Sequence, residues 1–261
     1  MNNFKIIIPA RLGSTRLPNK MLLDICGEPL IIRTAKQALR SQAKQVIVAT
    51  DHLDIVKVCE SHNIMVHLTS PTHTSGTERI AELVSNLNMK DNEIIINVQG
   101  DEPLIEPSLI NQLAEFIIKK SHENNLIKMA TIAHQINQYN EIINPNIVKT
   151  VLDNDNNALY FSRAPIPFSR DNFINKTDTT IPIQYKVLRH IGVYAYTVEF
   201  LKIYSKLSIS SIEQIESLEQ LRVLYNGYKI AVHQTDIIPA IGIDSIEDLE
   251  RVCKVLQDQR N

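Results

Sequence analysis

Three cations follow the first apolar run of the chain within a short polar stretch. The stretch 9–20, PARLGSTRLPNK, carries Arg11, Arg16 and Lys20 directly after FKIII. Guanidinium groups grip phosphate with paired hydrogen bonds, lysine adds a point charge, and backbone amides at a strand-to-loop turn can surround an anion. The stretch matches neither GxxxxGK[ST] nor GxGxxG, which argues against a Walker loop and a dinucleotide fingerprint. A triphosphate-binding loop and a solvated surface loop both remain open.

Two carboxylates stand at the ends of other apolar runs. Asp101 follows EIIINV within QGDEP, and Asp244 follows AIGI. A carboxylate at the mouth of a buried strand is costly unless it is paired or bound to metal. Two such groups without histidine or cysteine partners suit Mg²⁺, which prefers oxygen ligands and phosphate. A turn at Asp101 and a helix cap at Asp244 explain the same residues without a metal.

The stretch HTSGTER, residues 73–79, has the composition of a helix start that approaches a ligand. Ser75 or Thr77 can cap the helix, and Gly76 permits close backbone approach. Backbone groups and hydroxyls there are suited to bind the edge of a nucleobase. A plain helix N-terminus is the alternative.

Candidates for binding an acidic sugar occur later in the chain. Arg163 lies in YFSRAPIP and His190 in RHIGVYAY. Glu213 and Glu216 are three residues apart, so on a helix they share one face and can accept hydrogen bonds from sugar hydroxyls. An exposed acidic helix face explains the same pair without a ligand.

The first half of the chain alternates strand-like and helix-like segments, and these must position the candidate residues. Strands are expected at 5–8, 45–50, 64–67 and 93–98, and helices at 29–41, 53–62, 77–87 and 107–119. This alternation predicts a parallel sheet with helices on both faces. Ligands of such sheets bind at the carboxyl ends of the strands. Four polar stretches are expected at that edge, namely 9–20, 50–52, 99–103 and 241–245.

The pattern changes after about residue 125. Strand-like runs with fewer helices between them predict a mixed or antiparallel sheet at 128–133, 147–152, 158–162 and 190–196. Residues 171–182 are polar and predict an exposed, mobile loop. The remaining expected elements are a helix at 212–226 that ends at Gly227, a strand at 229–234, and a helix at 245–257 capped by Ser245.

The composition limits the class of protein. The chain has 261 residues, 44% of them hydrophobic and 21% charged, and a net charge of −2, so no global basic field attracts nucleic acid. Cys26, Cys59 and Cys253 form no CxxC pair, and the eight histidines show no HxxxH or HxH spacing. These patterns argue against zinc and favour a reducing compartment. The first apolar run is too short for a signal peptide, so we expect a cytoplasmic protein without membrane insertion.

Nine segments, in order along the chain, resemble the 3-deoxy-manno-octulosonate (Kdo) cytidylyltransferases. They are IIPARLGSTRLPNK, IVATDH, HTSGTERIAE, NVQGDEPLI, NPNIVKTVLD, ALYFSRAPIPF, RHIGVYAY, LEQLRVLYNGYKI and GIDSIEDLERV. The resemblance spans nearly the whole chain. It implies an α/β, Rossmann-like nucleotide-diphospho-sugar transferase fold with a mostly parallel central sheet and a smaller mixed-sheet lobe.

The resemblance also implies an activity and an assembly. The reaction would be CTP + Kdo → CMP-Kdo + pyrophosphate, which activates Kdo for lipopolysaccharide biosynthesis, with Mg²⁺ as cofactor. A homodimer is implied as well. Residues 1–261 would form one domain, with a nucleotide-binding core at about 1–125 and 228–261 and a sugar-binding and dimerisation lobe at about 126–227.

Each candidate residue receives a role from the same resemblance. The nucleotide-binding positions are Ala10, Arg11, Arg16, Lys20, Ser75, Gly76, Gln99 and Asp101, of which Arg11, Lys20 and Asp101 are catalytic. The magnesium ligands are Asp101 and Asp244. The sugar-binding positions are Gln99, Arg163, His190, Tyr194, Glu213 and Glu216. Gly13 departs from relatives that carry alanine, which loosens the loop and removes no donor.

Two alternative functions stay open at this point. A cytidylyltransferase for a related acidic sugar, 8-amino-Kdo or a sialic-acid-like sugar, would keep the same loop and metal ligands. A non-catalytic nucleotide-binding regulator would be expected to have lost a metal ligand, and both aspartates are present.

Overall fold

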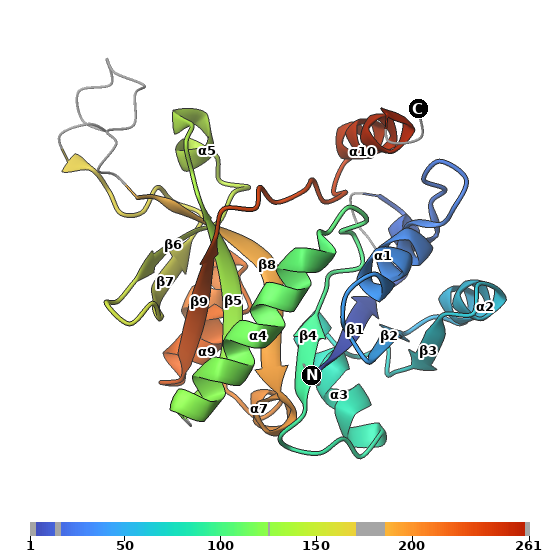
Figure 1. The fold of residues 1–261 in the computed structure, drawn as a ribbon, viewed down its shortest axis with the longest axis horizontal. Coiled ribbons are helices and arrows are strands. Elements are labelled where there is room, and N and C mark those ends of the chain that lie inside the picture. Colours follow the sequence, from blue (N-terminus) through green and yellow to red (C-terminus); the bar gives the residue numbers. More distant parts are fainter. Residues whose placement is uncertain (1–3, 14–16, 125, 171–185, 259–261) are drawn as a thin grey trace.

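The central sheet lies between two layers of helices (Figure 1). This architecture is seen in a computed structural model, which describes residues 4–13, 17–124, 126–170 and 186–258. The strand order is β3-β2-β1-β4-β8-β5-β9, with β6 and β7 attached beside β8. The predicted α/β class with a mostly parallel central sheet is confirmed. The mobile loop predicted at 171–182 lies outside the described residues.

The N-terminal half forms the parallel part of the sheet. Here β1 pairs with β2 and β4, and β2 pairs with β3, all in parallel. The four strands are Phe4–Ala10 (β1), Gln45–Thr50 (β2), Met65–Leu68 (β3) and Ile94–Asn97 (β4). The strands β1 and β4 are apolar along most of their length because helices cover both of their faces. All four strands match the strands predicted for this half.

The mixed part continues the same sheet rather than starting another one. The strand β8 runs antiparallel to both β4 and β5, and β9 lies parallel to β5. The hairpin of β6 and β7 attaches to β8. These strands are Ile127–Gln135 (β5), Lys149–Leu152 (β6), Ala158–Ser162 (β7), Leu188–Thr197 (β8) and Lys229–Thr235 (β9). The division of the chain into a core and a lobe stays a prediction.

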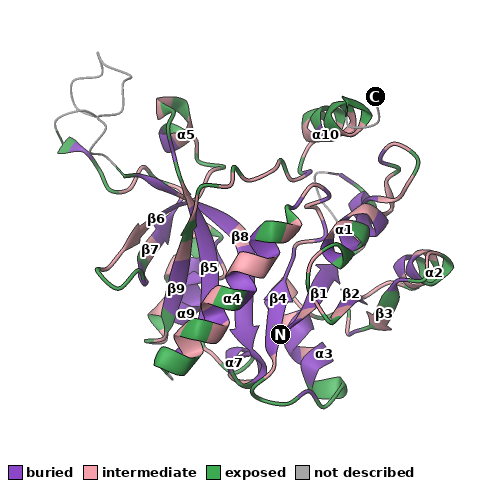
Figure 2. Ribbon diagram, in the orientation of Figure 1, coloured by how far each residue is buried: buried purple, intermediate pink, exposed green. Residues whose placement is uncertain are grey.

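Each face of the sheet has its own apolar core, seen as buried strands and inner helix faces in Figure 2. One face is covered by Leu30–Leu39 (α1), Leu53–Ser61 (α2) and Pro107–Glu123 (α4), and Ile246–Asp258 (α10) adds Val252 to the same core beyond the ends of the strands. The other is covered by Gly76–Asn86 (α3), Val198–Tyr204 (α7) and Leu221–Tyr225 (α9). Short helices complete the described chain at Lys20–Leu22 (η1), Tyr139–Ile143 (α5) and Ser211–Glu216 (α8).

The single helix predicted at 212–226 is wrong. The structure has α8 and α9 instead, separated by a turn in which Ser217 adopts a left-handed conformation with φ of 51°. The Leu218 amide donates to the Glu213 carbonyl at 3.1 Å, a bond that closes the end of α8. The apolar spacing fits one continuous helix, and serine replaces the glycine that usually marks such a turn. The break turns the residues after Ser217 toward the carboxyl edge of the sheet.

Candidate active site

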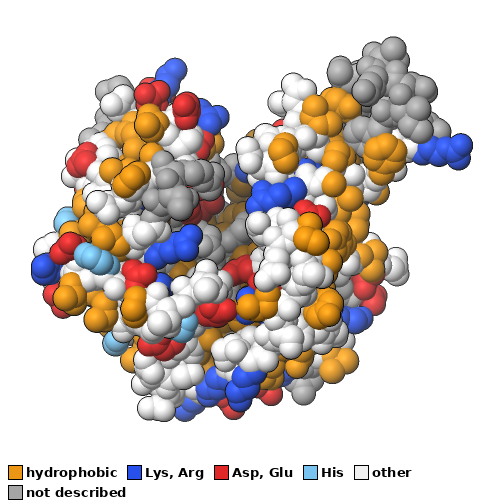
Figure 3. All heavy atoms as spheres, turned by 180° about the vertical axis from the view of Figure 1, so that it is seen from behind, with side chains coloured by type: hydrophobic (Ala, Val, Ile, Leu, Met, Phe, Trp, Pro, Cys, Tyr) orange, Lys and Arg blue, Asp and Glu red, His pale blue; other side chains and the backbone are white. Residues whose placement is uncertain are grey.

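A cleft of about 710 Å³ opens at the carboxyl edge of the parallel strands. Figure 3 shows the surface hollowed between the two halves of the molecule, with acidic and basic side chains along the hollow. The lining comes from the end of β1, η1, the start of α3, the end of β4, the α8–α9 segment and the loop before α10. Three of the four polar stretches predicted for this edge therefore meet here. The fourth, at 50–52, lies behind the cleft wall.

The opening loop places one cation in the cleft. The strand β1 ends at Ala10, and the exposed Arg11 lines the cleft, where its guanidinium makes no hydrogen bond or ion pair to the described residues. The amide of Leu12 donates to Asp51 Oδ1 at 3.3 Å and anchors the loop behind it. Arg16 lies outside the described residues. Arg11 is thus available to bind an anionic ligand.

Lys20 lies between the two predicted metal ligands. Its ammonium donates to Asp101 Oδ2 at 2.7 Å, to the Ile243 carbonyl at 2.8 Å and to Asp244 Oδ1 at 3.1 Å. Burial alone would lower the pKa of Lys20, but the attraction and hydrogen bonds of the two carboxylates outweigh it and raise the pKa. The two carboxylates, far apart in sequence, therefore meet at one buried cation.

The donor set of this site fits a hard divalent cation. Asp101 and Asp244 both contact the Lys20 ammonium, so both could also contact a single metal ion placed near that ammonium. Among the described residues, no group of three or more histidine, cysteine, aspartate or glutamate side chains could hold a metal. Mg²⁺ commonly uses one or two carboxylates and completes its shell with water and phosphate oxygens. The residues present fit that pattern, and the metal stays a prediction.

At two glycines that line the cleft, neighbouring segments pack so closely that a larger side chain would not fit. A Cβ at Gly76 would lie 3.0 Å from Pro9 Cγ, so the start of α3 packs directly on the end of β1. Ser75 caps α3 by accepting a hydrogen bond from the Glu78 amide at 3.2 Å, which confirms the predicted cap. A Cβ at Gly100 would lie 2.8 Å from Met21 Sδ and 3.2 Å from the Pro9 carbonyl oxygen. The segments that carry Arg11, Lys20 and Asp101 are therefore in mutual contact.

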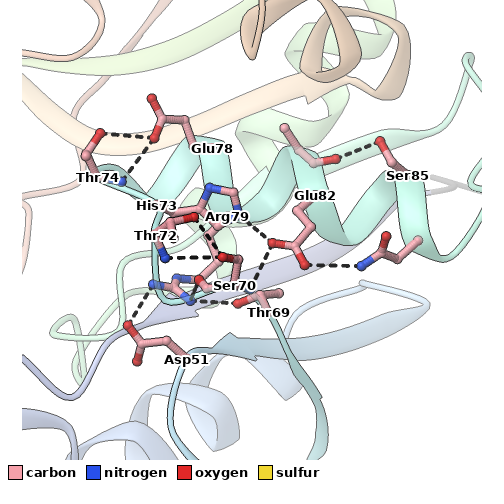
Figure 4. A network of polar contacts seen from close by, with 12 residues as sticks. Asp51, Thr69, Ser70, Thr72, His73, Thr74, Glu78, Arg79, Glu82 and Ser85 are labelled. Carbon is pink, nitrogen blue, oxygen red and sulfur yellow. Dashed lines mark hydrogen bonds and ion pairs between the residues drawn. The ribbon is translucent and has the colours of Figure 1, made fainter.

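A buried arginine, which is not among the residues predicted for the site, holds the loop before α3. Arg79 donates to Asp51 Oδ2 at 2.9 Å and to Thr69 Oγ1 at 2.6 Å (Figure 4). The carboxylate of Glu82 accepts from the Ser70 amide and from His73. These bonds connect the ends of β2 and β3 to α3 and support the wall that carries Ser75. An arginine four residues after a capping serine and an aspartate after an apolar strand were the available signals.

Glu213 and Glu216 do not present a shared acidic face to the cleft. The carboxylate of Glu213 pairs with Arg222 at 2.7 Å, and both residues line the cleft. The carboxylate of Glu216 accepts from Ser162 Oγ at 2.6 Å and from the Arg163 amide at 3.0 Å. Their different partners separate the two groups, because α8 packs Glu213 against α9 and Glu216 against β7.

Three other predicted sugar-binding residues lie within the mixed part of the sheet and are not among the residues that line the described cleft. Arg163 donates to the Glu216 and Pro145 carbonyls at 2.8 and 3.0 Å. His190 hydrogen-bonds Thr131 at 3.0 Å. Burial lowers the pKa of His190 to about 3, so a neutral imidazole offers a hydrogen bond and no charge. Tyr194 is buried beside His190, with ring centroids 5.4 Å apart.

Gln99 and Glu219 line the cleft from its two sides. Gln99 follows β4 and donates to Asn97 Oδ1 at 3.2 Å. Glu219 accepts from Thr77 Oγ1 at 2.7 Å, and burial raises its pKa. The sequence pattern gives no signal for Glu219, because this residue falls inside the one continuous helix predicted at 212–226. The break at Ser217 turns it into the cleft.

Comparison with known proteins identifies the family. The cytidylyltransferase family model matches residues 5–230. A 3-deoxy-manno-octulosonate cytidylyltransferase of Neisseria gonorrhoeae is 51% identical over 257 residues, covering 98% of this chain and 99% of that protein. The chain belongs to this family. A relative of the same name in Herminiimonas arsenicoxydans is 52% identical over 250 residues, covering 96% of this chain and 97% of its own.

A solved structure supports the family and the fold together. It is the structure of CMP:2-keto-3-deoxy-manno-octonic acid synthetase complexed with CTP, with a TM-score of 0.85 and 35% identity. The match covers 98% of this chain and 99% of that one. The predicted family and the predicted nucleotidyltransferase class are therefore confirmed. Within the described residues, no helix has both the length and the apolar character that crossing a bilayer requires.

The packing at Gly100 gives a prediction for stability. Gly100→Ala places a methyl against Met21 and the Pro9 carbonyl, so the free energy of unfolding should fall by about 1–3 kcal/mol. Gly192→Ala in β8 is the matched control, because a Cβ there meets no atom within 4 Å, and it should change stability by less than about 0.5 kcal/mol. Urea denaturation measures both. Equal stability of the two variants would contradict the tight contact at Gly100.

Proposed function

We propose that this chain transfers CMP from CTP to the anomeric hydroxyl of Kdo, giving CMP-Kdo and pyrophosphate. The observation that carries the proposal is the meeting of Arg11, Lys20, Asp101 and Asp244 in one cleft at the carboxyl edge of the sheet. The relatives named 3-deoxy-manno-octulosonate cytidylyltransferase support the choice of nucleotide and sugar. Activation of Kdo in this way belongs to lipopolysaccharide biosynthesis.

The nucleotide would lie along the wall formed by the end of β1 and the start of α3. Ala10, Ser75 and Gly76 line this wall, and their backbone groups and the Ser75 hydroxyl are suited to the cytidine. Arg11 faces the cleft with its hydrogen-bonding groups available, so it would bind the triphosphate. Lys20 would assist, since charge develops on the leaving pyrophosphate and a nearby cation stabilises it. Arg16 stays a further candidate for the same role.

Asp101 and Asp244 would hold Mg²⁺. A bound Mg²⁺ neutralises phosphate charge and eases deprotonation of a hydroxyl, so no dedicated protein base is required. Lys20 already neutralises the same two carboxylates. If another cation bound these carboxylates, the Lys20 ammonium would no longer be held by them and could bind the triphosphate. The side chains of this site thus act by binding and by charge neutralisation.

The sugar would lie on the side of the cleft opposite the opening loop. Glu219 lines the cleft there, Gln99 lines it from the other side after β4, and both can bind sugar hydroxyls. Arg163, His190 and Tyr194 stay candidates by resemblance, together with Glu213 and Glu216, although the structure gives these side chains partners within the protein. The attack on the α-phosphorus is an in-line displacement, which depends on alignment and charge stabilisation more than on covalent catalysis.

The proposal includes the cellular location and the oligomeric state of the enzyme. We infer a cytoplasmic homodimer that takes its substrates from solution. A cytidylyltransferase specific for 8-amino-Kdo or a sialic-acid-like sugar is the second candidate, because the loop and both carboxylates serve that reaction equally well.

A screen of pyrophosphate release tests the function directly. The purified chain is incubated with Mg²⁺, each of the four ribonucleoside triphosphates, and Kdo, 8-amino-Kdo or sialic acid. CTP with Kdo is expected to give the fastest release. Faster release with another acidic sugar would favour the second candidate, and no release with any pair would overturn both.

Replacing either carboxylate tests the proposed metal site. Asp101→Asn and Asp244→Asn each remove one charge and retain shape, so turnover should fall roughly 10²–10³-fold. Asp155→Asn, at an exposed turn between β6 and β7, is the matched control and should retain activity within about twofold. Pyrophosphate release at saturating substrates is measured while Mg²⁺ is varied. Near-normal turnover of either site variant would contradict the assignment.

A further inference from the structure

The first turn of α3 reaches across the floor of the cleft. Thr77 is buried, and its hydroxyl lies 2.7 Å from Glu219 Oε1 and 3.3 Å from the Tyr196 hydroxyl. A threonine hydroxyl has one hydrogen to donate, and here that hydrogen is directed at Glu219 Oε1. Thr77 therefore donates to Glu219 and accepts from Tyr196. Burial raises the pKa of Tyr196, which keeps the phenol protonated and able to donate.

A second link joins the same two segments. Glu78 Oε1 accepts from Arg222 Nη1 at 3.0 Å, and Arg222 holds Glu213 with its other nitrogens. Arg222 and Glu213 are almost completely withdrawn from solvent and Glu78 is partly buried, and charge-assisted hydrogen bonds in such places are strong and costly to leave unmade. Two successive residues of α3 thus bind the segment after Ser217, at Glu219 and at Arg222, and Arg222 in turn holds Glu213 before that turn.

The same turn also contacts the proposed nucleotide wall. Ser75 and Gly76 directly precede Thr77 and line the cleft, and Gly76 packs on Pro9. Residues 75–78 therefore connect the nucleotide wall to Glu219, which Thr77 contacts, and to Arg222, which Glu78 contacts and which holds Glu213. The Glu219 side chain itself has several rotatable bonds. The hydrogen bonds that the structure gives Arg222 go to Glu213 and Glu78, so Arg222 attracts the Glu219 carboxylate without fixing its direction.

We propose that Thr77 is a positioning residue, whose hydroxyl fixes the carboxylate of Glu219 in the orientation that binds the acidic sugar. The inference rests on the proposed function and adds to it the contact that sets the sugar-binding group. Thr77 donates to Oε1, the Ser75 hydroxyl adds a second hydrogen bond to the carboxylate, and the remaining lone pairs of the carboxylate can accept a sugar hydroxyl. The contact also ties Glu219 to the turn that follows the nucleotide wall.

Removal of a single hydroxyl tests the proposal. Thr77→Val retains the shape of the side chain, so the KM for Kdo should rise about tenfold or more, while the Kd for CTP from calorimetry stays within about twofold. Thr77→Ser restores the hydroxyl and should return the KM for Kdo to near the wild-type value. Thr150→Val is the matched control, because its buried hydroxyl donates to the Tyr160 carbonyl at 3.0 Å, away from the cleft.

The possible results distinguish the positioning role of Thr77 from the proposed function of the chain. An unchanged KM for Kdo in Thr77→Val, an equal loss of CTP affinity, or a Thr77→Ser variant as impaired as the valine variant would overturn the positioning role. If Thr77→Val does not fold, Tyr196→Phe removes the phenol that donates to Thr77 and also bonds Asn97; it should still raise the KM for Kdo, and no rise overturns the proposal. A wild-type chain without pyrophosphate release overturns the proposed function itself.

Discussion

The ammonium of Lys20 between Asp101 and Asp244 is the interaction on which the site depends. Two carboxylates that meet at one edge of a sheet repel each other, and a cation that contacts both of them offsets that repulsion. Lys20 is itself largely withdrawn from solvent and bonds to both of them and to the Ile243 carbonyl. This one cation therefore joins the segment after β1, the end of β4 and the loop before α10.

The cleft is built around the ion pairs of Lys20 with Asp101 and Asp244. The loop after β1 is anchored to Asp51, which is itself held by the buried Arg79, so the cleft wall is continuous from β1 to α3. The first turn of α3 then binds the α8–α9 segment through Thr77 and Glu78. Charged groups of both signs are thereby fixed on rigid elements around one cavity. Catalysis of phosphoryl transfer requires this kind of preorganisation, since alignment and charge stabilisation carry most of the effect.

The sequence was most informative where local patterns decide the structure. The alternation of apolar runs and amphipathic segments predicted the parallel strands, and the strand-end rule predicted that Lys20, Asp101 and Asp244 meet. It was least informative where a distant contact decides. Serine at a left-handed turn hides the break at Ser217, so Glu219 was missed. The partners of Glu213, Glu216 and Arg163, and the burial that keeps His190 neutral, come from packing between segments far apart in sequence.

Lys20 is the counter-ion of the two carboxylates, and in the proposed function it shares them with a divalent cation. Titration of wild type and Lys20→Met with Mn²⁺, without nucleotide, followed by electron paramagnetic resonance, tests it most directly. The account predicts tighter Mn²⁺ binding by Lys20→Met, because the competing ammonium is gone, and loss of that gain in Lys20→Met/Asp101→Asn. Unchanged or weaker binding by Lys20→Met would contradict it.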